Sequence, residues 1–306
     1  MGEQFSMWDY LREPIRIDKP IRLITLFSGY DSQAMALKRL GADFEHYRAI
    51  EIDKYAVKSL NLIHNTDFEP LDIREIKGGQ LGIVDKEHYT YIMTYSYPCT
   101  SLSVAGRQEG MERDSGTASS LIWEVERLLK ECNELGAIPD ILQMENVTEC
   151  HNYKNLKEFN EWTSFLESLG YTNYLADLNA SDYLIPQHRE RSIMFSILGN
   201  YNYKFPAPVE LEKCMADYLE DEVPENLYIK SEKALNLIIN LVDKGVLENE
   251  DALNERTNER TNERTNERLC IDGTIKEPRR IDVANCIKAK DRGLCNHKSE
   301  ENCIIE

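Results

Sequence analysis

Short apolar segments alternate along this chain with segments of helical periodicity. Residues 22–27 predict a β-strand, residues 28–31 a turn, and residues 32–40 a helix. Residues 47–52 predict a second strand, which is followed by a helical segment through Asn61. A strand, a crossover helix and a second strand together build a parallel sheet. This order therefore predicts an α/β fold with an open, mostly parallel sheet.

The alternation continues well beyond these segments. Further strands are predicted at residues 91–95, 140–144, 171–178 and 192–198, and further helices at residues 117–133 and 156–169. Pro206 and Pro208 then interrupt the pattern, because proline has no backbone N–H to donate. We therefore expect one domain over residues 1–205 and a less regular part over residues 206–306.

Composition restricts the classes of protein to which the chain can belong. Of its 306 residues, 42% are hydrophobic, which is enough for a sizeable core. No apolar run is long enough to span a bilayer, and the N-terminus lacks the apolar segment of a signal peptide, so we expect no membrane segment. Eight cysteines without a C-x-x-C pair predict neither a disulfide framework nor a metal site. Together these features favour a reducing, cytoplasmic setting.

One cysteine follows a predicted strand closely. Pro98 and Cys99 come shortly after residues 91–95, and an open α/β sheet binds its ligands at the carboxyl ends of its strands. Proline restricts the backbone and so orients the cysteine that follows it. Free cysteine is more often a small buried apolar residue, so Cys99 alone identifies no site.

Three charged residues lie beside other predicted strands. Glu145 follows a buried strand, and Arg189 and Arg191 precede another. A thiol nucleophile, a carboxylate and two guanidinium groups at strand ends indicate attack on a polar heterocycle. The structural alternatives are a helix cap at Glu145 and a surface pairing of the arginines with Glu190.

A second group of residues is typical of a nucleoside-binding site. Gly29 lies in the first strand-to-helix turn, where glycine lets a ligand approach the backbone. Glu51 ends the second predicted strand, where an acidic residue accepts hydrogen bonds from ribose hydroxyls. We expect Asp72 at the end of a third strand, where its carboxylate accepts from an adenine amino group. Ordinary turns and caps are the alternatives, but the three together favour an adenosyl ligand.

Six short motifs occur in a characteristic order. They are Phe27-Ser28-Gly29, Glu51-Ile52-Asp53, Asp72-Ile73, Pro98-Cys99, Glu145-Asn146-Val147 and Gln187-His188-Arg189-Glu190-Arg191. The set resembles the DNA (cytosine-5) methyltransferase family, most closely its phage and restriction-modification branch, over residues 21–198. The resemblance implies the open, Rossmann-like α/β sheet of S-adenosylmethionine-dependent methyltransferases, with a partial C-terminal extension.

The resemblance also implies a role for each motif. Cys99 would attack C6 of cytosine, and Glu145 would hold N3 and the exocyclic amine. Arg189 and Arg191 would meet the O2 side of the base. The residues that would line the S-adenosylmethionine pocket are Phe27, Gly29, Glu51, Ile52, Asp72 and Pro98. The implied partner is double-stranded DNA, from which the target base must be flipped.

The chain departs from the family pattern at two levels. Asp31 occupies the second glycine position of F-x-G-x-G, and Thr100 stands where glutamine is common. The later motifs R-x-L-T-x-x-E and G-N-S are not found, although residues 279–306 resemble the start of that region. We therefore expect an incomplete target-recognition region and a complementing polypeptide that supplies the rest. The alternatives are an inactive or complementation-dependent remnant that binds S-adenosylmethionine or DNA, and an RNA cytosine-5 methyltransferase.

The formal net charge of −18 bears on the DNA partner. Affinity for nucleic acid depends largely on Lys and Arg contacts with phosphates, so this charge argues against a polyanion. Much of the acid lies in residues 210–251, where residues 215–242 also predict an acidic helix. An acidic surface remote from the site would reconcile the charge with DNA binding, and both interpretations stay open.

Residues 254–268 form a perfect repeat of four residues, NERTNERTNERTNER. Such a polar segment buries no core, so we expect a loop or a frayed helix, with a charged interaction arm as the alternative. The base repeat AACG, translated as AAC-GAA-CGA-ACG, encodes Asn-Glu-Arg-Thr. Gain or loss of one four-base unit shifts the downstream reading frame. We therefore hypothesise phase variation, in which repeat slippage switches the gene or changes its C-terminus.

Overall fold

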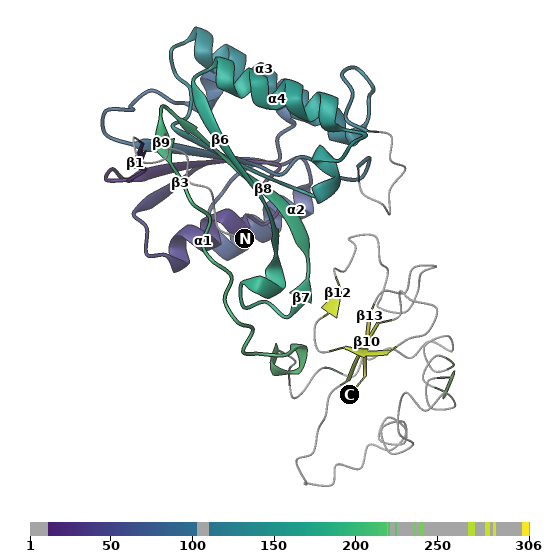
Figure 1. Cartoon of the computed structure of the whole chain (residues 1–306). Helices are drawn as coiled ribbons and strands as arrows, with labels where there is room; N and C mark the ends of the chain where they lie inside the picture. The colour runs from purple at the N-terminus through teal and green to yellow at the C-terminus, as the bar shows by residue number, and fades with distance from the viewer. Residues whose placement is uncertain are drawn as a thin grey trace. The chain divides into compact units, whose positions relative to one another are not determined.

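The chain folds into two units, each of which combines segments that are separate in the sequence (Figure 1). The first unit comprises Met1–Asp177 with Arg191–Pro206, and the second comprises Leu178–Glu190 with Ala207–Glu306. The computed structural model describes residues 12–102, 110–218, 220, 224, 236, 239, 240, 269–272, 279–281, 284–285 and 302–305. Most of the helix predicted at 215–242 and all of the repeat lie outside these residues.

A six-stranded sheet forms the centre of the first unit, with strand order β3-β2-β4-β5-β8-β6. Its strands are β2 (Ile21–Leu26), β3 (Phe44–Ile50), β4 (Thr90–Tyr95), β5 (Ile141–Asn146), β6 (Tyr171–Asn179) and β8 (Glu190–Leu198). β2 pairs in parallel with β3 and β4, and β4 pairs in parallel with β5. β8 runs antiparallel to β5. The prediction of an α/β fold with a mostly parallel sheet is confirmed.

Helices cover both faces of this sheet. They are α1 (Ser32–Arg39), α2 (Lys54–His64), α3 (Ile122–Glu134) and α4 (Leu156–Ser168). α3 and α4 lie on one face, and α1 and α2 lie on the other (Figure 1). Parallel neighbours need a crossover connection, which a helix usually supplies, and α1 and α3 do so between β2 and β3 and between β4 and β5.

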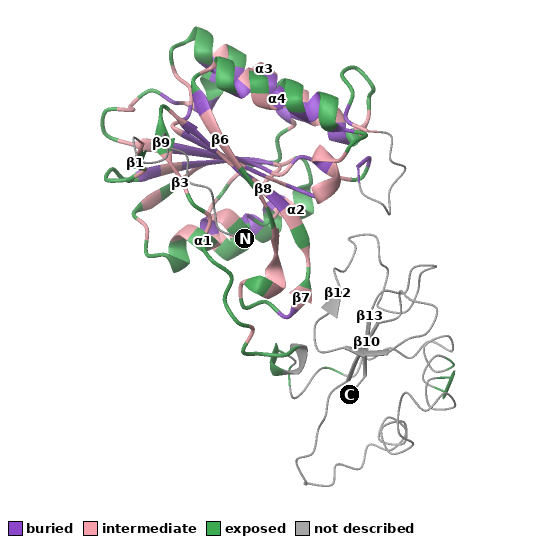
Figure 2. Cartoon of the chain, in the orientation of Figure 1, coloured by how far each residue is buried: buried purple, intermediate pink, exposed green. Residues whose placement is uncertain are grey.

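The apolar spacing of the helices explains how they pack. The buried apolar residues of α3 recur at intervals of three and four: Ile122, Val125, Leu128, Leu129 and Cys132. This spacing gathers them in one stripe, which packs with buried residues of the sheet in one core (Figure 2). In α4 the largest member of that core is Trp162, which is fully buried. Truncating such a side chain to alanine destabilises a fold by about 3–5 kcal/mol.

Two predictions about the cofactor half of the sheet need correction. β3 ends at Ile50, so Glu51 lies in the turn that follows the strand rather than inside it. Asp72 does not end a third strand, because two 3₁₀ helices, Ile73–Glu75 and Gly78–Leu81, form the connection between α2 and β4. Asp72 instead caps the first of these helices.

The remaining elements are short. In the first unit they are β1 (Glu13–Pro14), β9 (Tyr201–Asn202) and the 3₁₀ helices Ala118–Leu121 and Thr148–His151. In the second unit they are the 3₁₀ helices Ala180–Asp182 and Met215–Tyr218, and the strands β7 (Gln187–His188), β10 (Leu269–Asp272), β11 (Arg279–Ile281), β12 (Ala284–Asn285) and β13 (Asn302–Ile305). β12 pairs in parallel with β7, and β10 pairs with both β11 and β13. No helix in the described part of the chain combines the length and apolarity needed to cross a bilayer.

Candidate active site

The strand register brings the predicted motifs to one edge of the sheet. Leu26, the last residue of β2, is paired with both Ile50 and Tyr95, and Tyr95 is paired with Met144. β2, β3 and β4 therefore end level with one another, and β5 runs two residues further, to Asn146. The segments that follow β2, β3 and β4 contain the glycine turn, Glu51 and the Pro-Cys loop, whereas Glu145 is the penultimate residue of β5 and does not follow that strand as predicted. Because neighbouring strands lie about 4.8 Å apart, these four strand ends lie within a span of about 15 Å.

The turn after β2 has an unusual backbone. Phe27, Gly29 and Asp31 have φ values of 56°, 55° and 60°, all in the left-handed region. A Cβ atom added at Gly29 would meet no atom within 4 Å, so open space lies against its backbone. The Asp31 N–H donates to the Ser28 carbonyl at 2.8 Å, which closes the turn. This geometry lets a ligand approach the main chain directly.

Glu51 binds the glycine turn and still has capacity for a ligand. Its Oε2 accepts from the Gly29 N–H at 2.9 Å, and its Oε1 accepts from the Asp53 N–H at 2.9 Å. A carboxylate offers about four acceptor positions, so two remain for hydroxyl groups. The neighbouring Ile52 is 63% exposed and offers apolar surface for a flat ring. These residues fit a nucleoside.

Asp72 lies close to Glu51 in the chain fold, but its carboxylate is engaged. The Leu71 N–H donates to the Glu51 carbonyl at 2.7 Å, which brings the two motifs together. Arg74 donates to both Asp72 oxygens through its side chain and to one through its backbone N–H. These bonds lower the pKa of the Asp72 carboxyl. An adenine amino group would therefore have to displace Arg74.

The Pro-Cys loop is held through its main chain from two sides. Asn146 Nδ2 donates to the Tyr97 carbonyl at 2.9 Å, and Ser119 Oγ donates to the Pro98 carbonyl at 2.7 Å. Cys99 is partly exposed and packs against the main core. Sequence reasoning missed the roles of Asn146 and Ser119. The signal was present for Asn146, a polar residue at the end of a buried strand.

Glu145 and Arg191 form an ion pair at this edge. Arg191 Nε lies 3.2 Å from Glu145 Oε1, and the two side chains are 20% and 26% exposed, respectively. The pairing follows from the antiparallel direction of β8, whose Ser192 is opposite Asn146 at the end of β5. The start of β8 therefore lies where β5 ends. This pair contradicts the alternative in which Arg191 serves only a surface contact with Glu190.

Arg189 belongs to the second unit, whereas Arg191 belongs to the first. The Arg189 N–H donates to Asn179 Oδ1 at 3.0 Å, and its carbonyl accepts from the Ala180 N–H at 3.1 Å. Next to it, His188 of β7 is paired with Asn285 of β12. The structure thus unites Cys99, Glu145 and Arg191 in one unit and leaves the role of Arg189 as a prediction.

The other cysteines with described side chains differ from Cys99 in their surroundings. Burial raises the pKa of Cys132 to about 11 and that of Cys150 to about 12. Both are buried in the core, whereas Cys214 is exposed in the second unit. In the first unit, Cys99 is therefore the described thiol best placed to react.

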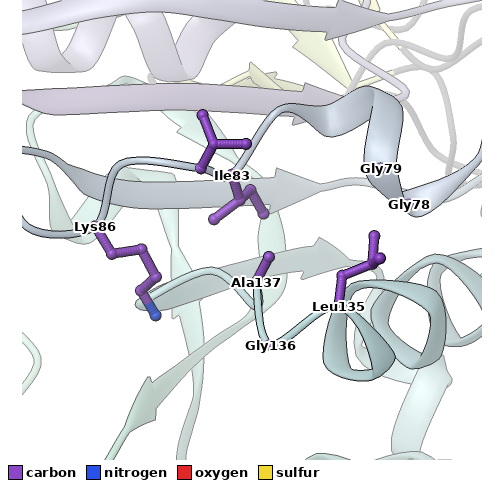
Figure 3. A pocket seen from close by; sticks show the side chains of 8 residues that line it. Gly78, Gly79, Ile83, Lys86, Leu135, Gly136 and Ala137 are labelled. Atoms are coloured by element: carbon purple, nitrogen blue, oxygen red, sulfur yellow. The ribbon is translucent and has the colours of Figure 1, made fainter.

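The first unit also has a pocket that lies away from the carboxyl ends of the strands (Figure 3). It has a volume of about 470 Å³ and is lined by residues that include Gly78, Lys86 and Leu135. These loops lead into β4 and β5, so they meet the amino ends of the strands rather than the carboxyl ends. The pocket is thus at the edge opposite Cys99 and Glu145.

Comparisons with a family model and with individual proteins agree on one family. A family model described as C-5 cytosine-specific DNA methylase matches residues 21–298. The Type II methyltransferase M2.ScrFI of Lactococcus lactis subsp. cremoris is 33% identical over an alignment of 259 residues, and the match covers 69% of this chain and 71% of that protein. The orphan methyltransferase M.SssI of Spiroplasma monobiae is 37% identical over 178 residues, which are 58% of this chain but 39% of that protein.

Solved structures show the same fold at lower identity. The Dnmt2 methyltransferase of S. pombe is 21% identical, with a TM-score of 0.54, and the match covers 72% of this chain and 65% of that chain. The Entamoeba histolytica methyltransferase EhMeth is 20% identical, with a TM-score of 0.57, and the match covers 75% of this chain and 67% of that chain.

Proposed function

Because this chain belongs to the family of C-5 cytosine-specific DNA methylases, we propose that it transfers a methyl group from S-adenosylmethionine to C5 of cytosine in DNA. The supporting observation is the edge of the sheet at which a partly exposed cysteine and the Glu145–Arg191 pair share a unit with the glycine turn. The names of the relatives favour a restriction-modification or phage setting.

Cys99 acts as the nucleophile in this proposal. Its thiolate sulfur forms a bond to C6 of the flipped cytosine, and the C5–C6 double-bond electrons move so that C5 becomes nucleophilic. When bound, S-adenosylmethionine supplies the methyl group that C5 takes. A base then removes the C5 proton, the C5–C6 double bond re-forms, and the Cys99 sulfur leaves as thiolate.

Glu145 and Arg191 stabilise the charge that develops on the base. Addition at C6 places negative charge on N3 and O2 of cytosine. A proton held by Glu145 at N3 and the guanidinium of Arg191 near O2 both oppose this charge. Their 3.2 Å contact keeps the carboxylate and the cation oriented before the base arrives. Arg189 keeps its proposed role at the O2 side of the base.

The cofactor is proposed to bind across the turns after β2 and β3. Glu51 has free acceptor positions for the ribose hydroxyls, the Gly29 backbone borders open space, and Ile52 offers apolar contact for the adenine. Phe27 and Pro98 border the same edge. Asp72 is proposed to accept from the adenine amino group after Arg74 has moved aside.

A covalent trapping experiment tests the proposal. The purified chain is incubated with labelled S-adenosylmethionine and duplex DNA that carries 5-fluorocytosine. We expect a denaturation-resistant protein–DNA adduct in the wild type and none in Cys99→Ser, because fluorine blocks the removal of the C5 substituent and so prevents release of the sulfur. Cys132→Ser is the matched control and is expected to keep the adduct.

Three other outcomes would each favour a different account of the chain. Cofactor binding without an adduct indicates a remnant that binds without transferring. An adduct that appears only after a second polypeptide is added supports the complementing partner. Transfer to RNA but not to duplex DNA indicates an RNA cytosine-5 methyltransferase. The net charge of −18 makes the salt dependence of DNA binding a useful companion measurement.

A further inference from the structure

Asp31 adopts a backbone conformation that normally favours glycine. Its φ is 60° and its ψ is 73°, in the left-handed region. Aspartate tolerates this region better than most residues, because its short side chain forms hydrogen bonds locally. Asp31 is also completely buried, and a buried carboxylate is unfavourable unless it is paired. The residue at the family's second glycine position therefore needs partners.

Two partners hold the Asp31 carboxylate. Its Oδ1 accepts from the Ala34 N–H at 3.0 Å and caps α1. Its Oδ2 lies 2.6 Å from Nε2 of His46, a residue of β3 whose side chain is only 8% exposed. One carboxylate thus connects the glycine turn to the helix that follows it and to the neighbouring strand.

The residue before Asp31 is held by a second histidine. Nε2 of His64, the last residue of α2, lies 3.0 Å from the Tyr30 carbonyl oxygen. A carbonyl only accepts, so this nitrogen is the donor. The His46 and His64 rings meet edge to face with centroids 5.3 Å apart, and Phe68 packs on His46 at 4.9 Å. The two imidazoles are therefore packed together against the turn.

We propose that His46 and His64 are positioning residues that hold turn 28–31 in the conformation that binds the adenosyl cofactor. The proposal rests on the proposed function for the identity of that cofactor. Holding the turn in its bound conformation reduces the conformational entropy that binding would otherwise remove. Neither histidine lies on an element that carries Cys99 or Glu145, so the effect belongs to cofactor affinity and not to the transfer step.

Histidine variants separate these two effects. We expect His46→Leu and His64→Leu to raise the dissociation constant for S-adenosylmethionine about tenfold, the size expected when one polar contact that holds the turn is lost. The rate of methyl transfer at saturating cofactor should stay close to that of the wild type. His88→Leu is the matched control, since His88 contacts Asp85 on the surface and is 71% exposed. Calorimetry gives the affinity, and thermal unfolding gives the stability.

Two further variants show whether the contact between His46 and Asp31 is itself responsible for the change in cofactor affinity. His46→Gln keeps a donor at the Nε2 position and should restore most of the affinity. The double variant Asp31→Gly with His46→Leu leaves no buried carboxylate unpaired and should bind the cofactor better than His46→Leu alone. If His46→Leu does not fold, His46→Gln and His64→Leu still test the proposal.

The proposal is overturned if the variants lose thermal stability while their cofactor affinity stays that of the wild type, or if His88→Leu weakens binding equally. Loss of transfer rate at unchanged affinity also overturns it. A wild-type chain that binds no S-adenosylmethionine contradicts the proposed function together with this proposal. Wild-type binding with unchanged affinity in the variants contradicts this proposal alone.

Discussion

At the scale of single residues, the described cysteines of the first unit differ in how far their thiols are buried. Cys150 is fully buried, and removal from solvent raises its pKa to about 12. Cys132 is buried beside Gly78, and its pKa is raised to about 11. Cys99 is instead partly exposed on a loop that Asn146 and Ser119 hold by its carbonyls.

We expect iodoacetamide at neutral pH to modify Cys99 in the folded protein and to leave Cys132 and Cys150 unmodified. Alkylation requires thiolate, and a thiol whose pKa is about 11 or 12 is almost entirely protonated at neutral pH. Mass spectrometry of the peptides gives the modified fraction at each site. The unfolded protein is the control, in which all three should react. Modification of Cys150 at the rate of Cys99 would contradict the assignment.

Glu145 offers a second prediction at this scale. Glu145→Gln keeps the shape of the side chain but removes the proton that the carboxyl would hold at N3. Loss of a positioned acid or base typically slows a reaction by about 10²-fold or more. We therefore expect kcat to fall by that factor and the affinity for S-adenosylmethionine to stay unchanged. Glu167→Gln, on the exposed face of α4, is the control and should not alter kcat.

At the scale of elements, α3 anchors the connection that carries Asp72. Arg127 donates to the Ile73 and Ile76 carbonyls, both at 2.9 Å. Glu131 Oε2 accepts from the Gly78 N–H at 2.6 Å, and its Oε1 pairs with Arg127. The connection forms no strand, so side chains of a neighbouring helix satisfy its backbone groups instead.

Gly78 should not tolerate a side chain. A Cβ atom there would lie 2.7 Å from Glu131 Cβ and 2.9 Å from the Leu128 carbonyl oxygen, so the connection or α3 would have to shift. We expect Gly78→Ala to lower the free energy of unfolding by about 1–3 kcal/mol. Urea unfolding measures the change. Gly79→Ala, whose nearest neighbour is a side-chain atom at 3.4 Å, is the matched control and should have a smaller effect.

The Glu131 contacts should make the protein less stable as the pH falls. The Gly78 N–H, with Arg127, holds the pKa of Glu131 below its usual value. Glu131 therefore contributes to the free energy of unfolding at pH values above the pKa that its carboxyl has in the unfolded chain. This contribution is lost as the pH falls through the lower pKa that the carboxyl has in the folded protein. Glu131→Gln should destabilise the protein at neutral pH. The difference from the wild type should shrink at about pH 3, as urea unfolding at both pH values would show.

At the scale of the whole molecule, the chain after the repeat belongs to the same family domain as the chain before it. The family model matches residues 21–298 and so spans the repeat at 254–268. Strands β10, β11, β12 and β13 all follow the repeat, and β12 pairs with β7, directly before Arg189. A frame shift in the repeat would remove all these strands.

We therefore expect activity to depend on the reading frame after the repeat and not on the length of the repeat itself. Adding one Asn-Glu-Arg-Thr unit in frame should preserve methyl transfer, whereas a chain that ends after Arg268 should lose it. Both variants are assayed with labelled S-adenosylmethionine. Sequencing of the locus from many clones should show the codons AAC, GAA, CGA and ACG and mixed numbers of AACG units. A uniform repeat number or other codons would contradict repeat slippage, and an active truncated chain would contradict the need for β10–β13.

Much of the catalytic edge could be predicted from the chain alone, and some of it could not. The Cys99 and Gly29 motifs follow apolar strands and Glu145 lies near the end of one, so periodicity and residue type place them at strand ends. The predicted strand end at Asp72 is wrong, because the Asp72 carboxylate instead binds Arg74 in a 3₁₀ turn.

Sequence by itself determined the alternation of strands and helices and the chemistry of the motifs, because both depend on local spacing and on side-chain type. Tertiary structure alone decided which side chains meet. Arg191 reaches Glu145 because β8 runs antiparallel to β5, and Asp31 meets His46 because β3 lies beside β2. Strand direction and strand order depend on contacts between distant parts of the chain, and local sequence does not encode them.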